Sequence, residues 1–172
     1  MRILPAIALA ATLAAVGPAI ADETGGRMVT LRADEIGHIF CYSRLGNDDA
    51  VISGILTADL AAAIAAARKA DAAFAKAHPG DKPPLGDGIP WQSRADQADN
   101  CDVGLVSLSR MDARVEIRYG FKADPNAGYI DVLLLKKVPI EGTDAGRWRI
   151  DDLSYTDGGD LRGALRDAFT TN

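Results

Sequence analysis

The stretch that decides the fold is WRIDDLSY, residues 148–155. Trp148 and Ile150 share one parity, whereas Leu153 and Tyr155 have the other. Successive side chains of a strand point to opposite faces of the sheet, so a regular strand would leave one of these pairs in water. One extra residue at Asp151-Asp152, a β-bulge, returns all four side chains to one face. The sequence therefore predicts a bulged strand over residues 147–155.

Three further strands are expected upstream of this one. Apolar and charged residues alternate over residues 114–121, which is typical of a half-buried strand. Residues 129–138 form the most apolar segment, and we expect it to lie at the centre of the sheet. One face of that strand would carry Ile130, Val132 and Leu134, and the other would carry Asp131, Leu133 and Leu135. A period of two already begins at Val103, so the sheet should have about four antiparallel strands.

Helices are expected both before and after the strands in the sequence. Apolar spacing predicts one helix over residues 30–45, a short one ending near Thr57, and a long Ala-rich one over residues 57–77 that Thr57 caps. The segment from Pro79 to Pro90 is rich in glycine and proline but has no phosphate-binding loop motif. We therefore expect an ordered connection that Trp91 packs onto the fold. A short C-terminal helix should follow Asp160, its cap. The fold class is α+β.

The WRIDDLSY stretch followed by Leu161-Arg162 resembles the ending of a family of exported bacterial domains of unknown function in the nuclear-transport-factor-like (cystatin-like) superfamily. The resemblance is sharpest from Tyr129 to Leu165. It implies N-terminal helices packed on a curved, cone-shaped antiparallel sheet. The superfamily includes isomerases, dehydratases, ligand binders and immunity or interaction proteins, so the resemblance implies a fold and no particular reaction.

The first 21 residues predict a signal peptide. Met1 and Arg2 precede an Ala/Leu-rich apolar stretch, and Ala19-Ile20-Ala21 provides small residues at a cleavage site. We expect cleavage after Ala21, a mature domain over residues 22–172, and a periplasmic or secreted protein. An uncleaved membrane anchor is the alternative, since a spanning helix needs ~20 apolar residues. Beyond this segment we expect no membrane span.

Cys41 and Cys101 are the only cysteines of the chain. An oxidising compartment would let them pair, and the resulting disulfide would close a loop of about 60 residues. The alternative is a reactive thiol or a metal site, but the chain has no C-x-x-C motif and two histidines only. We therefore expect a structural disulfide, with no metal site and no cofactor.

The charge balance argues against nucleic acid as a partner. The 172 residues carry 24 acidic and 19 basic side chains, for a net charge of -5. Nucleic-acid binding depends largely on basic residues that contact phosphates. The sequence therefore excludes binding through a generally basic surface.

Candidates for acid/base catalysis in a concave pocket are His38, Asp131 and Tyr119. Each also has a purely structural interpretation. His38 would be a partly exposed helix residue, Tyr119 a core residue, and Asp131 a partner of Arg114 or Arg118 across the strands. No Ser/His/Asp or Cys/His set is visible, so the residues favour a binding protein over an enzyme.

The binding hypothesis concerns the sheet surface. Arg114 and Arg118 would point outward, and Leu133 and Leu135 would add apolar area if their face were open. Such a surface would suit another envelope protein or a second copy of the chain, as in an inhibitor or immunity-type factor. The alternative is a small-molecule binder or a lyase/isomerase-type enzyme that uses the pocket of the cone. An enclosed pocket holding His38 or Asp131 would favour that alternative.

Overall fold

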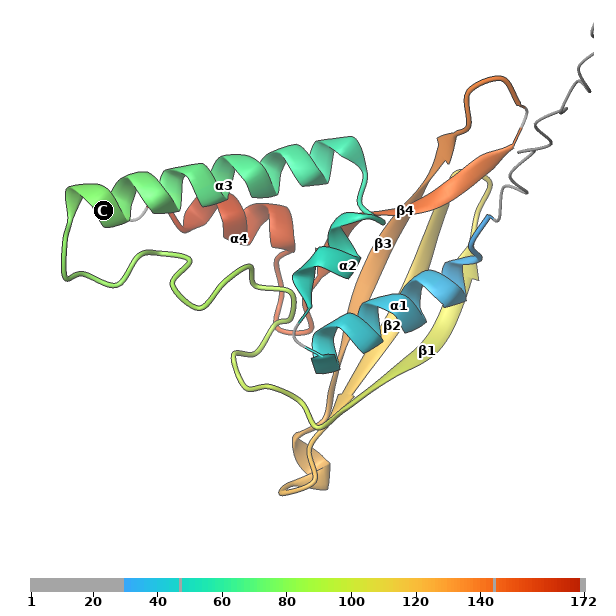
Figure 1. Ribbon diagram of the computed structural model, residues 1–172. Coiled ribbons are helices and arrows are strands. Elements are labelled where there is room, and N and C mark those ends of the chain that lie inside the picture. The colour runs from blue at the N-terminus through green and yellow to red at the C-terminus, as the bar shows by residue number, and fades with distance from the viewer. Residues whose placement is uncertain (1–29, 47, 144, 171–172) are drawn as a thin grey trace, which may run out of the picture.

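The computed structural model describes residues 30–46, 48–143 and 145–170. The predicted signal peptide, residues 1–21, lies outside them. Three helices come first, then four strands with a short 3-10 helix between the second and third, and finally a fourth helix (Figure 1). The bounds are α1 Ala33–Gly46, α2 Asp49–Ser53, α3 Ala58–Ala77, β1 Asn100–Leu108, β2 Asp112–Gly120, η1 Pro125–Ala127, β3 Tyr129–Pro139, β4 Gly146–Ser154 and α4 Leu161–Asp167. None of the described helices is both long and apolar enough to cross a membrane.

The four strands form one antiparallel sheet in the order β1-β2-β3-β4. The predicted α+β class is therefore confirmed. Figure 1 shows α1 lying across one face of the sheet, while α3 and α4 run together and extend away from the β4 side. The helix ends follow the predicted caps: Thr57 accepts a hydrogen bond from Leu60 N at the start of α3, and Asp160 accepts one from Gly163 N at the start of α4.

The core lies between α1 and the face of the sheet that it covers. Ile36 and Phe40 of α1 are fully buried there, as are Val115 and Ile117 of β2. Helix and sheet approach closely at Gly37, where an added Cβ would lie 2.8 Å from Val115 Cγ1. A larger residue at this position would therefore push α1 away from the sheet.

The bulge in β4 is confirmed. Leu134 of β3 lies opposite Asp152 and Leu135 lies opposite Ile150, which leaves Asp151 as the extra residue. Ile150 and Leu153 are consequently both buried in the core. Trp148 and Tyr155, the outer members of the predicted set of four, are half-buried and pack against the same core.

The expected surface of Arg114 and Arg118 with Leu133 and Leu135 does not form. Leu133 and Leu135 are 0% and 1% exposed, because their face of β3 is the face that α1 covers. The register pairs Leu133 with Val115, a core residue of β2. Arg114 and Arg118 have the opposite parity on β2 and are exposed on the other face of the sheet.

The predicted disulfide between Cys41 and Cys101 is present. It ties the second half of α1 to the start of the sheet, because Cys101 is the second residue of β1. Both cysteines are buried. The bond therefore fixes α1 on the core face of the sheet.

Replacing Cys41 and Cys101 together by Ala should lower the free energy of unfolding by about 4 kcal/mol, because the unfolded chain regains the freedom of a loop whose ends are 60 residues apart. Urea denaturation of a protein comprising residues 22–172 measures the change, and reduced wild-type protein is the matched control. Equal stability of the oxidised wild type and the double variant would show that the bond has no structural task.

Candidate functional site

A pocket of about 520 Å³ lies beside the sheet, between the loop that follows α3 and the C-terminal helix. We call residues 79–95 the strap and the cavity the strap pocket. Most of its wall is strap sequence between Pro84 and Ala95. Arg44 near the end of α1 and two alanines, Ala164 and Ala168, complete the wall. The pocket thus joins three parts of the chain that are distant in sequence.

Buried contacts hold the strap in place. Trp91 is 2% exposed, and its ring meets the ring of Phe40 edge-on with centroids 6.3 Å apart. Tyr155 donates its hydroxyl hydrogen to Pro90 O at 2.6 Å. Further back, Asp71 of α3 accepts a hydrogen bond from Leu85 N at 2.7 Å. The strap is therefore an ordered wall, and Trp91 packs it onto the core as the sequence predicts.

Asp131 of β3 anchors the strap to the sheet. Its carboxylate is fully buried; Oδ2 accepts a hydrogen bond from Ser93 N at 2.9 Å, and Oδ1 accepts one from Thr156 N at 2.9 Å. Ser93 is itself part of the pocket wall. One carboxylate thereby joins the strap to the turn after β4, in place of the predicted pairing with Arg114 or Arg118. A buried ion is stable only when its lone pairs are satisfied in this way.

Three tyrosines surround this buried carboxylate. Burial, reinforced by the charge of Asp131, raises the pKa of Tyr119 and Tyr155 far above the ordinary value. The same two causes raise the pKa of Tyr129 to about 12. The rings of Tyr119 and Tyr129 are stacked with centroids 4.7 Å apart. The three phenols are neutral at physiological pH; Tyr119 and Tyr155 donate to backbone oxygens of the strap, whereas Tyr129 serves as a packing group.

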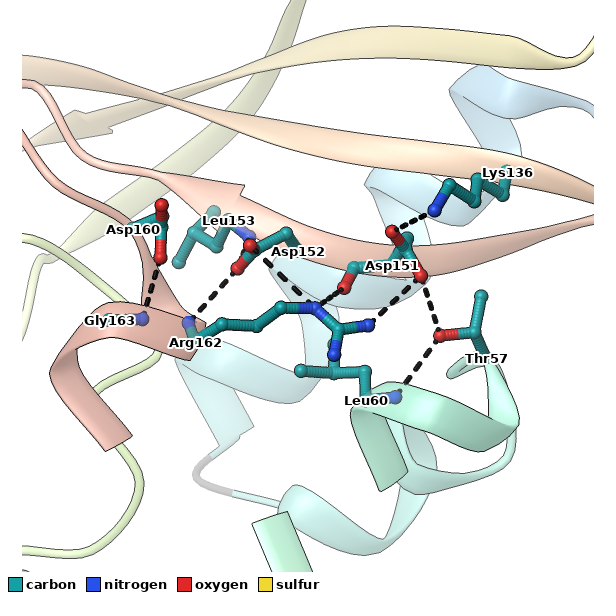
Figure 2. Close-up of polar contacts among 9 residues, drawn as sticks. All are labelled: Thr57, Leu60, Lys136, Asp151, Asp152, Leu153, Asp160, Arg162 and Gly163. Atoms are coloured by element: carbon teal, nitrogen blue, oxygen red, sulfur yellow. Dashed lines mark hydrogen bonds and ion pairs between the residues drawn. The ribbon is translucent and has the colours of Figure 1, made fainter. Parts of the chain in front are cut away.

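The other wall of the pocket depends on the bulge in β4. Arg162, the second residue of α4, donates through Nε to the backbone oxygen of Asp151 and through Nη2 to Asp151 Oδ1, both at 3.0 Å (Figure 2). Asp151 also accepts a hydrogen bond from Thr57 Oγ1 and forms an ion pair with Lys136 Nζ at 2.8 Å. The bulged residue therefore connects the start of α3, strand β3 and α4. We call this group the bulge clamp.

Asp152 completes the bulge clamp from the next position. Its Oδ1 accepts hydrogen bonds from Leu153 N and Arg162 N. Burial raises the pKa of Asp152. Asp151 behaves in the opposite way: burial opposes its ionisation, but hydrogen bonds from Lys136 and Thr57 outweigh this effect and lower its pKa. The pKa values of these two neighbouring carboxyl groups are thus shifted in opposite directions.

The structure separates the predicted catalytic candidates. His38 is exposed on α1, whereas Asp131 is buried beneath the strap. Tyr119 does lie near Asp131, but its hydroxyl group faces the backbone oxygen of Trp91 at 3.5 Å. Within the described residues no group of three or more His, Cys, Asp or Glu side chains could hold a metal ion.

Sequence reasoning missed most of the pocket. It interpreted the strap as a connection and did not single out Arg44, Ser93 or Arg94. The available signal was the polar run Gln92-Ser93-Arg94 directly after Trp91, which places hydrogen-bonding groups beside a buried aromatic ring.

Comparisons with protein-family models, with curated proteins and with solved structures found no match.

The bulge clamp predicts opposite pH effects for its two carboxyls. Because the pKa of Asp151 is lower in the folded state than the value of about 3.9 in the unfolded state, its ionised form stabilises the fold above that pH. This stabilisation is lost as the pH falls through the folded-state pKa. Relative to wild type, D151N should therefore become progressively less stable as the pH rises from 2 to 6. The raised pKa of Asp152 reverses the sign, so D152N should gain relative stability over the same range. Urea denaturation at a series of pH values measures both trends, and parallel trends would contradict the assignment.

Proposed function

We propose that this chain is an extracytoplasmic binding module that holds a small molecule in the strap pocket. The observation that carries the proposal is the pocket itself. Its volume of about 520 Å³ falls within the range of about 300–1,000 Å³ typical of small-molecule sites. Buried hydrogen bonds fix the strap before any ligand arrives, which lowers the entropic cost of binding.

Binding is favoured over catalysis by the groups around the pocket. A general base must be free to take a proton at hydrogen-bond distance from the substrate. Both oxygens of Asp131 are already bonded to backbone amides, and the nearby tyrosines have raised pKa values. His38, the other candidate, is exposed on α1. Among the described residues, the candidates His38, Asp131 and Tyr119 thus give the enzyme hypothesis, a lyase or isomerase, no free acid/base group in the strap pocket.

A small molecule is also favoured over a protein partner. The protein-interaction hypothesis relied on Leu133 and Leu135 to give apolar area beside Arg114 and Arg118, and both leucines are buried. Interfaces between proteins are depleted of charge at their centre, where aromatic and apolar side chains are enriched. On the outer face the two arginines lie opposite Leu134 and Ile130, so that face keeps some apolar side chains but not the two leucines on which the hypothesis relied.

The proposed location follows from two features of the chain. Residues 1–21 have the pattern of a signal peptide, and the Cys41–Cys101 disulfide is consistent with an oxidising compartment. We therefore place the mature protein in the periplasm or outside the cell. Membership of the exported nuclear-transport-factor-like family is part of the same proposal; the helices and the four-stranded antiparallel sheet support it.

Filling the strap pocket tests the proposed function. Ala164 lines the pocket, so A164F should occupy part of it, whereas A62F adds the same ring at an exposed position of α3. A fragment panel containing anions, cations and neutral compounds is screened by thermal shift against the mature protein. We expect compounds that raise the Tm of wild type and of A62F and that have no effect on A164F. A panel with no stabilising compound, or stabilisation that persists in A164F, would contradict the proposal.

A further inference from the structure

Among the described residues, three that line the strap pocket have a buried side-chain donor without an acceptor. Four buried side-chain polar atoms lack a hydrogen-bond partner within the part of the chain that the structure describes: Arg44 Nε, Trp91 Nε1, Ser93 Oγ and Tyr129 Oη. Arg44, Trp91 and Ser93 all line the pocket. From this coincidence we propose that the strap pocket takes a small anion whose carboxylate or phosphate oxygens accept from these three residues, an inference that rests on the proposed function.

Arg44 supplies a guanidinium group, whose positive charge Asp49 partly balances. Its side chain is 15% exposed, and Nη1 lies 3.1 Å from Asp49 Oδ1, which leaves Nε without an acceptor. A guanidinium stays protonated throughout the physiological pH range and can only donate. An unpaired buried donor costs free energy, and an anionic oxygen satisfies it better than a neutral one.

Trp91 and Ser93 add neutral donors from the strap. The indole N–H of Trp91 can only donate, and Trp91 is 2% exposed. Ser93 is fixed through its backbone N–H by Asp131, while its hydroxyl group is unpartnered. A hydroxyl group accepts as well as donates, so Ser93 adapts to the ligand, whereas Arg44 and Trp91 demand an acceptor.

Arg94 places a second positive charge at the same wall. Its guanidinium carbon lies 4.8 Å from the centroid of the Tyr129 ring, and Nη1 donates to Ala127 O at 3.0 Å. Nε also lies 3.7 Å from Asp157 Oδ2, so this charge is partly balanced. The carboxylate of the pocket wall, Asp87, forms an ion pair with Lys82 at 2.5 Å. The lining itself thus carries two arginines and one carboxylate, and the ion-pair partner of each lies outside the lining, so the unpartnered donors carry the inference more than the net charge does.

The remaining residues of the wall indicate the chemistry of the rest of the ligand. Leu85, Ile89, Ala164 and Ala168 contribute apolar surface to the pocket. An apolar or aromatic body would bury this surface while its acidic group reaches the donors. The chemical class is thus a small organic acid, either a carboxylate or a phosphate ester.

Three compounds of nearly equal shape separate charge from size: benzoate, benzamide and benzamidine. Isothermal titration of the mature protein at constant ionic strength should detect benzoate and give at least about tenfold weaker binding for neutral benzamide and cationic benzamidine. Phenyl phosphate and inorganic phosphate extend the series: binding of phenyl phosphate but not of benzoate would assign the phosphate class. Inorganic phosphate should bind more weakly than phenyl phosphate, because it leaves the apolar wall unused.

Two variants connect this selectivity to the named donors. R44Q removes the charge and should weaken benzoate binding at least about tenfold, and W91F removes the indole N–H while it keeps an aromatic ring and should weaken binding severalfold. R114Q is the matched control, since Arg114 is exposed on the opposite face of the sheet; its affinity should equal that of wild type. Circular dichroism and Tm confirm that each variant is folded, and W91F keeps the test valid if R44Q unfolds.

The outcomes separate the two proposals. If benzamide or benzamidine binds as tightly as benzoate and A164F abolishes that binding, the pocket is a ligand site but the anion inference is wrong. If folded R44Q and W91F both bind benzoate as wild type does, the assignment of the donors is wrong. If no compound of any charge class binds or raises the Tm, the proposed function fails together with the inference.

Discussion

A single buried carboxylate, that of Asp131, organises the part of the molecule in which a ligand could bind. It lies on the core face of β3 with no solvent exposure, and each of its oxygens accepts a hydrogen bond from a backbone amide. The donors, Ser93 and Thr156, belong to segments 38 and 25 residues away in sequence. Because a carboxyl group buried in a core needs hydrogen-bond partners, the strap and the turn after β4 must both be in place.

The bulge in β4 provides the second constraint. Asp151 is displaced from the regular alternation of the strand, so its carboxylate can reach Arg162, Thr57 and Lys136 at once (Figure 2). These contacts place α3 and α4 beside the sheet, and α4 brings Ala164 to the strap pocket. Two polar clusters thus hold two walls of the strap pocket: Asp131 holds the strap, and the bulge clamp holds the start of α4.

Much of the fold could be predicted because its signals are local. Alternation located the strands, the parity change at Asp151-Asp152 gave the bulge, and Thr57 and Asp160 marked the helix starts. The disulfide followed from the presence of two cysteines and a predicted export signal. Each of these inferences needs only the residues within one element, or a count over the chain.

Local patterns could not predict which face of β3 is buried, and they could not predict the strap pocket. Both faces of β3 carry apolar residues, and the carboxylate of Asp131 made its own face resemble a solvated one. Its partners are backbone amides of distant loops, which leave no trace in side-chain patterns. The strap pocket was missed for a related reason: Arg44, Trp91 and Ala164 come together only through the tertiary fold.

If Asp131 holds the strap, amide hydrogen exchange of D131N must report the loss of one of its two hydrogen bonds. An Asn side chain keeps one acceptor oxygen but turns an NH2 group toward the second amide, so one of the two hydrogen bonds must break. We expect the amide of Ser93 or Thr156 to exchange about ten- to a hundredfold faster than in wild type, while Leu133 in the centre of the sheet keeps its protection. D112N, an exposed change on β2, is the control and should alter neither amide. Unchanged protection of both Ser93 and Thr156 in folded D131N would show that Asp131 does not hold the strap.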